Sequence, residues 1–181
     1  MTDNPNSLYA LPDQMKAVVT LGEGGYDKLS YQHVDIPDIG PDEVLLKVLA
    51  AGVNNTDINT RLGWYSRKVE TSTAESAERD AGDGSGGWAG QTPFPLIQGT
   101  DCCGEIIAVG AETDKSLLGQ RALVRACMRT NGFDSFDMTW MASNFNGAFA
   151  GYVAVPASEV FPVSCEWSDA ELATIPCLCH C

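Results

Sequence analysis

Short apolar segments separated by glycine and proline dominate this chain and restrict the folds that it can adopt. Several of them alternate apolar and polar residues at the two-residue period of a half-buried strand. The clearest segments are "MKAVVTL", "EVLLKVLAAGV", "CGEIIAVG", "QRALVRAC" and "GAFAGYVAVP". Many short strands with few helical patterns favour a β-barrel-like domain. We therefore expect a mainly β protein with short helices.

The 181 residues are enough for one domain with a real core. We expect residues 1–14 to form a flexible leader and the polar, glycine-rich stretch 66–92 to be a mobile insertion. In "WSDAELATIP", Ser168 and Glu171 have the spacing of a capping box. This pattern predicts a helix that begins near Asp169.

The charge and the N-terminus limit the partners and the compartment. A formal net charge of −13 disfavours binding to nucleic acid or to an anionic membrane. The sequence has no long apolar run, and its first residues do not resemble a signal peptide. We expect a cytoplasmic protein whose seven cysteines are thiols.

Several motifs, in order, resemble the N-terminal, GroES-like catalytic domain of the medium-chain dehydrogenase/reductase superfamily. "MKAVV" matches its first strand, and "DIGPDEVLLKV" resembles the family's "PGPGEVLVKV". "GAFAGYVAVPAS" resembles the family's "GGYAEYVVVPA". The other matching segments are "AGVNNTDINTRLGWY", "FPLIQGTDCCGEIIAVG", "LLGQRALV" and "DAELATIPC".

The resemblance implies a GroES-like, partly open β-barrel over residues 15–167. It also implies that residues 168–181 begin the helix leading into a Rossmann-type cofactor domain. The chain stops where that domain would start, so we expect a truncated product, with a genuine short protein as the alternative. NADPH or NADH would bind to the full-length parent, and the residues that choose between them would lie in the missing domain.

Zinc-dependent relatives hold catalytic zinc through a Cys, a His and a later Cys or Asp. Here Asn54 stands at the Cys position, Thr100 at the His position and Asp101 at the position of the following Glu. Cys177 matches the third ligand at most, and one ligand cannot hold the metal. The region of the structural zinc lobe contains only Cys127. We therefore expect no metal site.

Cys102 and Cys103 are adjacent in a predicted strand. Neighbouring side chains of a strand point to opposite faces, so the two thiols are poorly placed to chelate one metal, and a disulfide between them would be strained. We expect two small buried thiols, and redox activity is the alternative.

Loss of the zinc ligands favours the zinc-free branch, which resembles quinone oxidoreductases and enoyl reductases. The chain matches the "GVNxxDxxxRxGxY" loop of that branch. The resemblance implies three site residues. Asn54 would face the nicotinamide or the substrate carbonyl, Tyr65 would donate to the developing enolate, and Thr56 matches a proton-relay hydroxyl of the zinc-dependent relatives. Asp57 and Arg61 are spaced for a local ion pair if their segment is helical.

The leading hypothesis is the substrate-side domain of a zinc-independent NAD(P)H-dependent oxidoreductase, which acts on a small carbonyl, enone or quinone. As this fragment it would be inactive, and it would be an enzyme only if the parent has a Rossmann domain. A zinc-type alcohol dehydrogenase relative that has lost its metal ligands is one alternative, and a non-enzymatic GroES-like binding module is another. Exposed apolar surface would favour self-association, so a homo-oligomer is expected.

Overall fold

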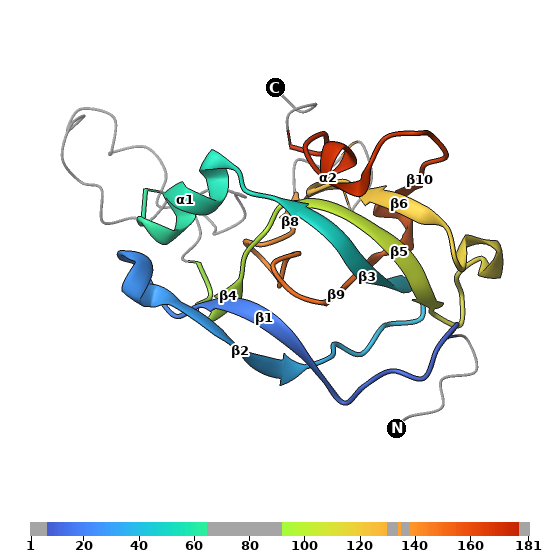
Figure 1. Cartoon of the computed structure of the whole chain (residues 1–181), viewed down its shortest axis with the longest axis horizontal. Helices are drawn as coiled ribbons and strands as arrows, with labels where there is room; N and C mark the ends of the chain where they lie inside the picture. Colours follow the sequence, from blue (N-terminus) through green and yellow to red (C-terminus); the bar gives the residue numbers. More distant parts are fainter. Residues whose placement is uncertain (1–6, 65–91, 130–133, 135–137, 178–181) are drawn as a thin grey trace.

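Two sheets contain most of the strands in the described residues. The computed structural model describes residues 7–64, 92–129, 134 and 138–177. The larger sheet has five strands in the order β10-β6-β5-β3-β9, and the smaller has the order β2-β1-β4 (Figure 1). The bounds are β1 Gln14–Thr20, β2 Leu29–Asp35, β3 Glu43–Gly52, β4 Leu96–Ile97, β5 Asp101–Val109, β6 Arg121–Val124, β9 Tyr152–Pro156 and β10 Val160–Pro162.

The remaining regular elements are short. They are the strands β7 Cys127–Met128 and β8 Thr139–Trp140, which pair with each other, the helices α1 Asn55–Arg61 and α2 Asp169–Leu172, and the single-turn 3-10 helices Tyr26–Lys28, Lys115–Leu117 and Ala157–Glu159. The described part of the chain is thus mainly β with two short α-helices, and its sheets do not close. This arrangement confirms the predicted GroES-like, partly open barrel.

The core lies against the central strands of the larger sheet. Val44, Leu46, Ile106 and Val155 are almost fully buried and belong to one apolar cluster. β5 is buried along nearly its whole length because apolar clusters cover both of its faces: Ile106 packs in the main cluster and Ile107 in another. The apolar run of this strand is therefore explained by burial on both faces of the sheet.

Only the second half of the segment "GAFAGYVAVP", which was predicted to be a strand, forms a regular strand. β9 begins at Tyr152, whereas Gly147, Ala148 and Phe149 donate backbone hydrogen bonds to the segment 97–99. An added Cβ at Gly147 would lie 2.5 Å from the Gly99 carbonyl oxygen. Glycine therefore permits this close backbone approach beside the start of β5.

The ends of β3 and β5 meet at the end of the sheet where α1 begins. Gly52 at the end of β3 pairs with Asp101 at the start of β5. α1 begins three residues after β3 ends, so the antiparallel register places its first turn beside Asp101. Figure 1 shows α1 and α2 on the same side of the larger sheet.

The helix predicted at Asp169 is confirmed. α2 begins at Asp169, and both hydrogen bonds of the Ser168–Glu171 capping box are formed. Leu172 and Ala173 pack with Cys103 on the outer face of β5. Within the described residues, no helix combines the length and the apolar character needed to cross a membrane.

Candidate functional site

Asn54 is the N-cap of α1. Its side-chain oxygen accepts a hydrogen bond from the Thr56 backbone N–H at 3.4 Å, and its own backbone N–H donates to Asp57 Oδ2 at 2.9 Å. These reciprocal contacts form a capping box that stabilises the first turn of the helix. The segment is thus helical, which is the condition on which the expected Asp57–Arg61 pair depended. Asn54 and Thr56 are therefore held in one local frame.

Hydrogen bonds of Asp57 hold α1 against the segment that precedes β5. Its Oδ1 accepts from the Gly99 backbone N–H at 3.0 Å, and its backbone oxygen accepts from Gln98 Nε2 at 2.8 Å. The Asp57 side chain is buried, and this burial raises the pKa of its carboxyl group. The backbone N–H donors lower the same pKa, and the nearby Asp101 carboxylate raises it. Their combined effect is smaller than that of burial.

The expected ion pair between Asp57 and Arg61 is wrong. Arg61 Nη1 donates to the Gly24 carbonyl oxygen at 2.5 Å, and the guanidinium lies 4.8 Å from the centre of the Tyr26 ring. Asp57 meanwhile uses both carboxylate oxygens on backbone N–H groups. Tertiary contacts to the β1–β2 connection thus replace the local helical pair.

Asp101 joins three segments that are distant in the sequence. Its Oδ2 accepts from Asn54 Nδ2 at 3.3 Å, and its Oδ1 accepts from the Cys177 backbone N–H at 2.5 Å. Burial is the largest cause of a raised pKa at this carboxyl group, and both hydrogen bonds oppose it. From the sequence, Asp101 was interpreted only as the residue at the position of the family's Glu. The signal that could have found it is a carboxylate at the start of an otherwise apolar strand.

The Cys177 thiol lies in the same cluster. Burial raises its pKa, and the Asp101 carboxylate raises it further. The hydroxyl groups of Thr56 and Thr100 act in the opposite direction. The Thr100 hydroxyl is fully buried and has no well-aligned hydrogen-bond partner among the described residues. The fold therefore brings together the three positions at which zinc-dependent relatives are expected to hold metal.

The donors at these positions do not fit zinc. Asn54 offers an amide and Thr100 a hydroxyl, both poor zinc ligands. Both Asp101 oxygens already accept hydrogen bonds, which leaves Cys177 as the one soft donor. Within the parts of the chain that the structure describes, no three His, Cys, Asp or Glu residues are grouped to hold a metal ion.

Cys102 and Cys103 point to opposite faces of β5, as the strand period predicts. Cys102 lies in the main core cluster, whereas Cys103 packs against Leu172 and Ala173. Burial raises the pKa of Cys102 to about 12 and that of Cys103 to about 11. Both are free thiols in this structure. Neither thiol therefore readily forms the nucleophilic thiolate.

Tyr65, the third expected site residue, lies outside the described residues, as does almost the whole of the 66–92 insertion. Asn54 and Thr56 are brought together with Asp101 and Cys177, and their catalytic roles remain predictions. The boundaries proposed for the leader and for the start of a cofactor domain also remain predictions.

The chain belongs to the alcohol dehydrogenase GroES-like domain family, whose model matches residues 40–165. This result confirms the predicted relationship to the medium-chain dehydrogenase/reductases. One curated relative is the L-threonine 3-dehydrogenase of Rhizobium rhizogenes strain K84, 26% identical over 154 residues, which are 80% of this chain and 38% of the enzyme. Another is the sorbitol dehydrogenase of Bacillus subtilis strain 168, 28% identical over 91% of this chain and 43% of the enzyme.

Among solved structures, a proposed alcohol dehydrogenase from Sinorhizobium meliloti 1021 is similar to this chain. It has a TM-score of 0.78 and 36% sequence identity, over 93% of this chain and 45% of that one. The chain thus spans about two fifths of the length of the relatives it matches. The family is that of oxidoreductases, and the activity of a whole protein belongs to the proposal below.

Proposed function

We propose that the chain is the substrate-side domain of a zinc-independent oxidoreductase that reduces a conjugated carbonyl, an enone or a quinone, with NADPH or NADH. The observation that carries the proposal is the Asn54 amide. Asp101 binds one side of the amide nitrogen, while the amide oxygen caps α1. An amide has two N–H donors, so the second is available to a substrate oxygen.

The bound nicotinamide cofactor would supply the hydride, and the protein would supply orientation and a donor for the developing negative charge. In this proposal the free Asn54 N–H donates to the carbonyl oxygen of the substrate. Asp101 acts through Asn54 as a positioning residue, because its carboxylate restricts rotation of the amide. The Thr56 hydroxyl and the Tyr65 phenol are the proposed proton donors to the reduced product.

A zinc-type alcohol dehydrogenase relative that has lost its ligands is the second candidate. It is favoured by the names of the curated relatives, L-threonine 3-dehydrogenase and sorbitol dehydrogenase. The two candidates differ in substrate, since the first reduces enones or quinones and the second acts on simple or polyhydric alcohols. A stand-alone barrel with no enzymatic activity would do neither.

The coding region should first be sequenced through and beyond the codon for Cys177. A following strand, glycine-rich turn and helix would support a two-domain reductase. Absence of any such segment would favour the non-enzymatic barrel.

Activity is then tested on a chimera that joins the chain to the cofactor half of the Sinorhizobium meliloti relative. We expect NADPH oxidation with 1,4-benzoquinone or 2-cyclohexenone, without added zinc. Asn54→Ser keeps a capping oxygen but removes the amide donor, so kcat should fall by about 100-fold. Asn55→Ser is the matched control on the exposed neighbouring residue and should retain activity. Oxidation of alcohols alone would instead support the second candidate.

A further inference from the structure

A large cavity lies beside the smaller sheet, apart from the cluster around Asn54 and Asp101. Its volume is about 720 Å³. The cavity is about half open to solvent, and its volume is within the range of small-molecule sites. None of the residues that join Asn54 to Cys177 lines this cavity. It is therefore a separate site that the proposed oxidoreductase function does not use.

The walls are apolar and come from both sheets. The apolar side chains that line the cavity include Met15, Val19, Val34, Ile97, Phe145 and Val153. Met15, Val19 and Ile97 also belong to the small core cluster on β1 and β4, against which Val34 packs. Strands of both sheets line it: β1, β2 and β4 of the smaller sheet and β9 of the larger sheet. Such walls select a ligand with an apolar body.

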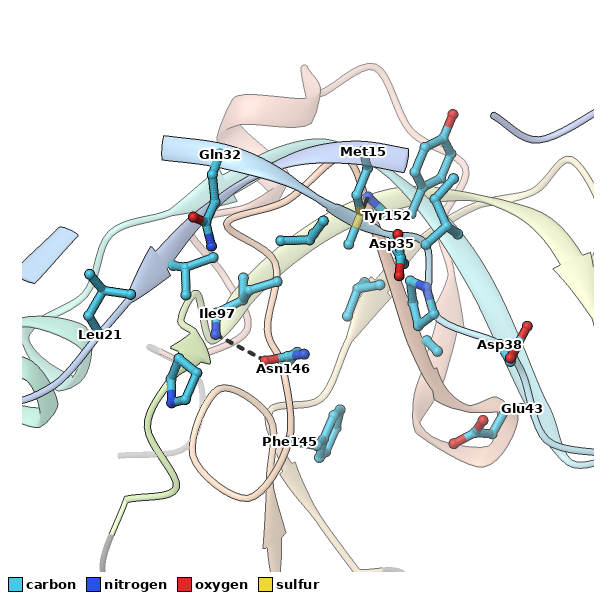
Figure 2. A pocket seen from close by; sticks show the side chains of 17 residues that line it. Met15, Leu21, Gln32, Asp35, Asp38, Glu43, Ile97, Phe145, Asn146 and Tyr152 are labelled. Carbon is cyan, nitrogen blue, oxygen red and sulfur yellow. Dashed lines mark hydrogen bonds between the residues drawn. The ribbon is translucent and has the colours of Figure 1, made fainter. Parts of the chain in front are cut away.

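The polar groups are distributed unevenly along the cavity. Figure 2 shows Asp35, Asp38 and Glu43 at one end, with Leu21 at the opposite end. Gln32 and Asn146 lie between the two ends. Asn146 Oδ1 accepts from the Ile97 backbone N–H at 3.0 Å. Within the described residues, the lining contains no Lys, Arg or His. One end is thus acidic and has no compensating positive charge in its wall.

The three carboxylates remain uncompensated even where they are hydrogen-bonded. Asp35 Oδ1 accepts from Gln14 Nε2 at 3.2 Å, and Glu43 Oε2 accepts from the Gly40 backbone N–H at 2.7 Å. Both donors are neutral. Asp38 has no hydrogen bond or ion pair with any other described residue. Positive charge placed at this end would therefore be attracted by three carboxylates without displacing an existing ion pair.

Two aromatic residues lie near the acidic end. Figure 2 shows the Phe145 ring at the lower wall, between Asn146 and Glu43, whereas the Tyr152 ring lies above Asp35 and points away from the middle of the cavity. The face of an aromatic ring attracts an organic cation electrostatically. Apolar walls and uncompensated carboxylates, with the Phe145 ring in the wall, together favour one kind of occupant over anions and neutral molecules.

We propose that this cavity binds an amphiphilic organic cation, a primary or secondary amine on an apolar body. The ammonium group lies among Asp35, Asp38 and Glu43, and the hydrocarbon body extends along the apolar walls towards Leu21. This site is independent of the oxidoreductase cleft, so it can be tested on the 181-residue chain itself.

The test compares three probes of similar size: phenethylamine, 2-phenylethanol and 3-phenylpropionate. Calorimetric titration should show tightest binding for the amine, weaker binding for the alcohol and weakest for the carboxylate. Raising the ionic strength from about 20 to 300 mM should weaken binding of the amine alone, because partly exposed charges are screened. Equal binding of the amine and the alcohol would overturn the proposal.

Substitutions of the acidic lining residues then test where the ammonium group binds. Asp35 and Asp38 are exposed, so Asp38→Asn should weaken phenethylamine binding by only about two- to fivefold, and the Asp35→Asn/Asp38→Asn double variant should weaken it further. Asp42→Asn is the matched control, since Asp42 is exposed on the same connection and does not line the cavity. An equal loss in Asp42→Asn would show a general effect of net charge and contradict the site.

Methyl NMR gives a readout that does not depend on any variant folding. Phenethylamine should shift the methyl resonances of Val34, Ile97 and Val153 in the wild-type chain. Shifts confined to methyl groups outside the cavity would overturn the proposal.

Discussion

The backbone N–H of Cys177 donates a hydrogen bond of 2.5 Å to Oδ1 of Asp101, across 76 positions of sequence. The same carboxylate accepts from Asn54 Nδ2 through its other oxygen. One buried side chain therefore connects the turn after α2, the start of β5 and the N-cap of α1. Together with Asp57, which binds Gly99 and Gln98, this carboxylate holds the elements of the candidate site.

Asp101→Asn should lower the free energy of unfolding by about 1–3 kcal/mol, because the new amide can accept only one of the two hydrogen bonds. Its NH2 group would then face either the Asn54 amide or the Cys177 N–H, both of which are donors. Urea unfolding followed by circular dichroism measures the change. Glu166→Gln, an exposed acid-to-amide control, should change stability by less than about 0.5 kcal/mol. Equal stability of Asp101→Asn and wild type would show that the carboxylate does not hold the three segments together.

Asp57 should make the free energy of unfolding fall as the pH rises, which is opposite to the usual effect of a carboxylate. Its pKa is raised in the folded protein, mainly by burial, from an ordinary value of 3.8. The folded state therefore binds the proton more tightly than the unfolded state, and the contribution of this group to stability is full below pH 3.8. It declines as the pH rises through the raised pKa.

The measurement is the free energy of unfolding of wild type minus that of Asp57→Asn, from urea curves between about pH 3.5 and pH 7. This difference should become smaller as the pH rises. A difference that grows with pH would mean that the backbone donors of Asn54 and Gly99 outweigh burial.

The thiols should react with an alkylating reagent in an order set by burial. Cys165 is exposed, whereas Cys102 and Cys103 are buried and have pKa values raised to about 12 and about 11. At pH 8, Cys165 should be modified roughly 100-fold faster than Cys102 in the native protein. Peptide mapping after timed exposure to iodoacetamide reports each site separately. In urea the rates should converge, and native rates that are already similar would contradict the buried placement of β5.

Gly99→Ala should destabilise the protein strongly. Gly99 has a φ of +103°, and an added Cβ would lie 2.7 Å from the backbone nitrogen of Phe149. Steric conflict with backbone and an unfavourable φ should cost about 2–4 kcal/mol. Thermal unfolding measures the loss. Gly22→Ala is the control, because its Cβ would meet nothing within 4 Å, and a comparable loss there would contradict the steric explanation.

Local sequence was sufficient for several elements. The alternation in "MKAVVTL" predicted a strand, and β1 covers Gln14–Thr20. Ser168 and Glu171 predicted the start of α2, because a capping box involves residues only three positions apart. The two-residue period also separated Cys102 from Cys103 correctly, since adjacent side chains of any strand face opposite ways.

Other features depend on which segments the fold brings together. Arg61 has the spacing for an ion pair with Asp57, yet it binds the Gly24 carbonyl oxygen because the β1–β2 connection lies beside α1. The link from Asn54 through Asp101 to Cys177 requires the register of β3 on β5 and the return of the chain after α2. The cavity requires strands of both sheets to border one space.

The sequence by itself therefore determined the fold class, the family, the strand faces and the helix caps, because each depends on short-range periodicity or on ordered motifs. Only the tertiary structure decided the partners of Asp57, Arg61 and Asp101 and the acidic end of the cavity. Those partners are many residues apart in the chain, and sheet register and packing determine which of them meet.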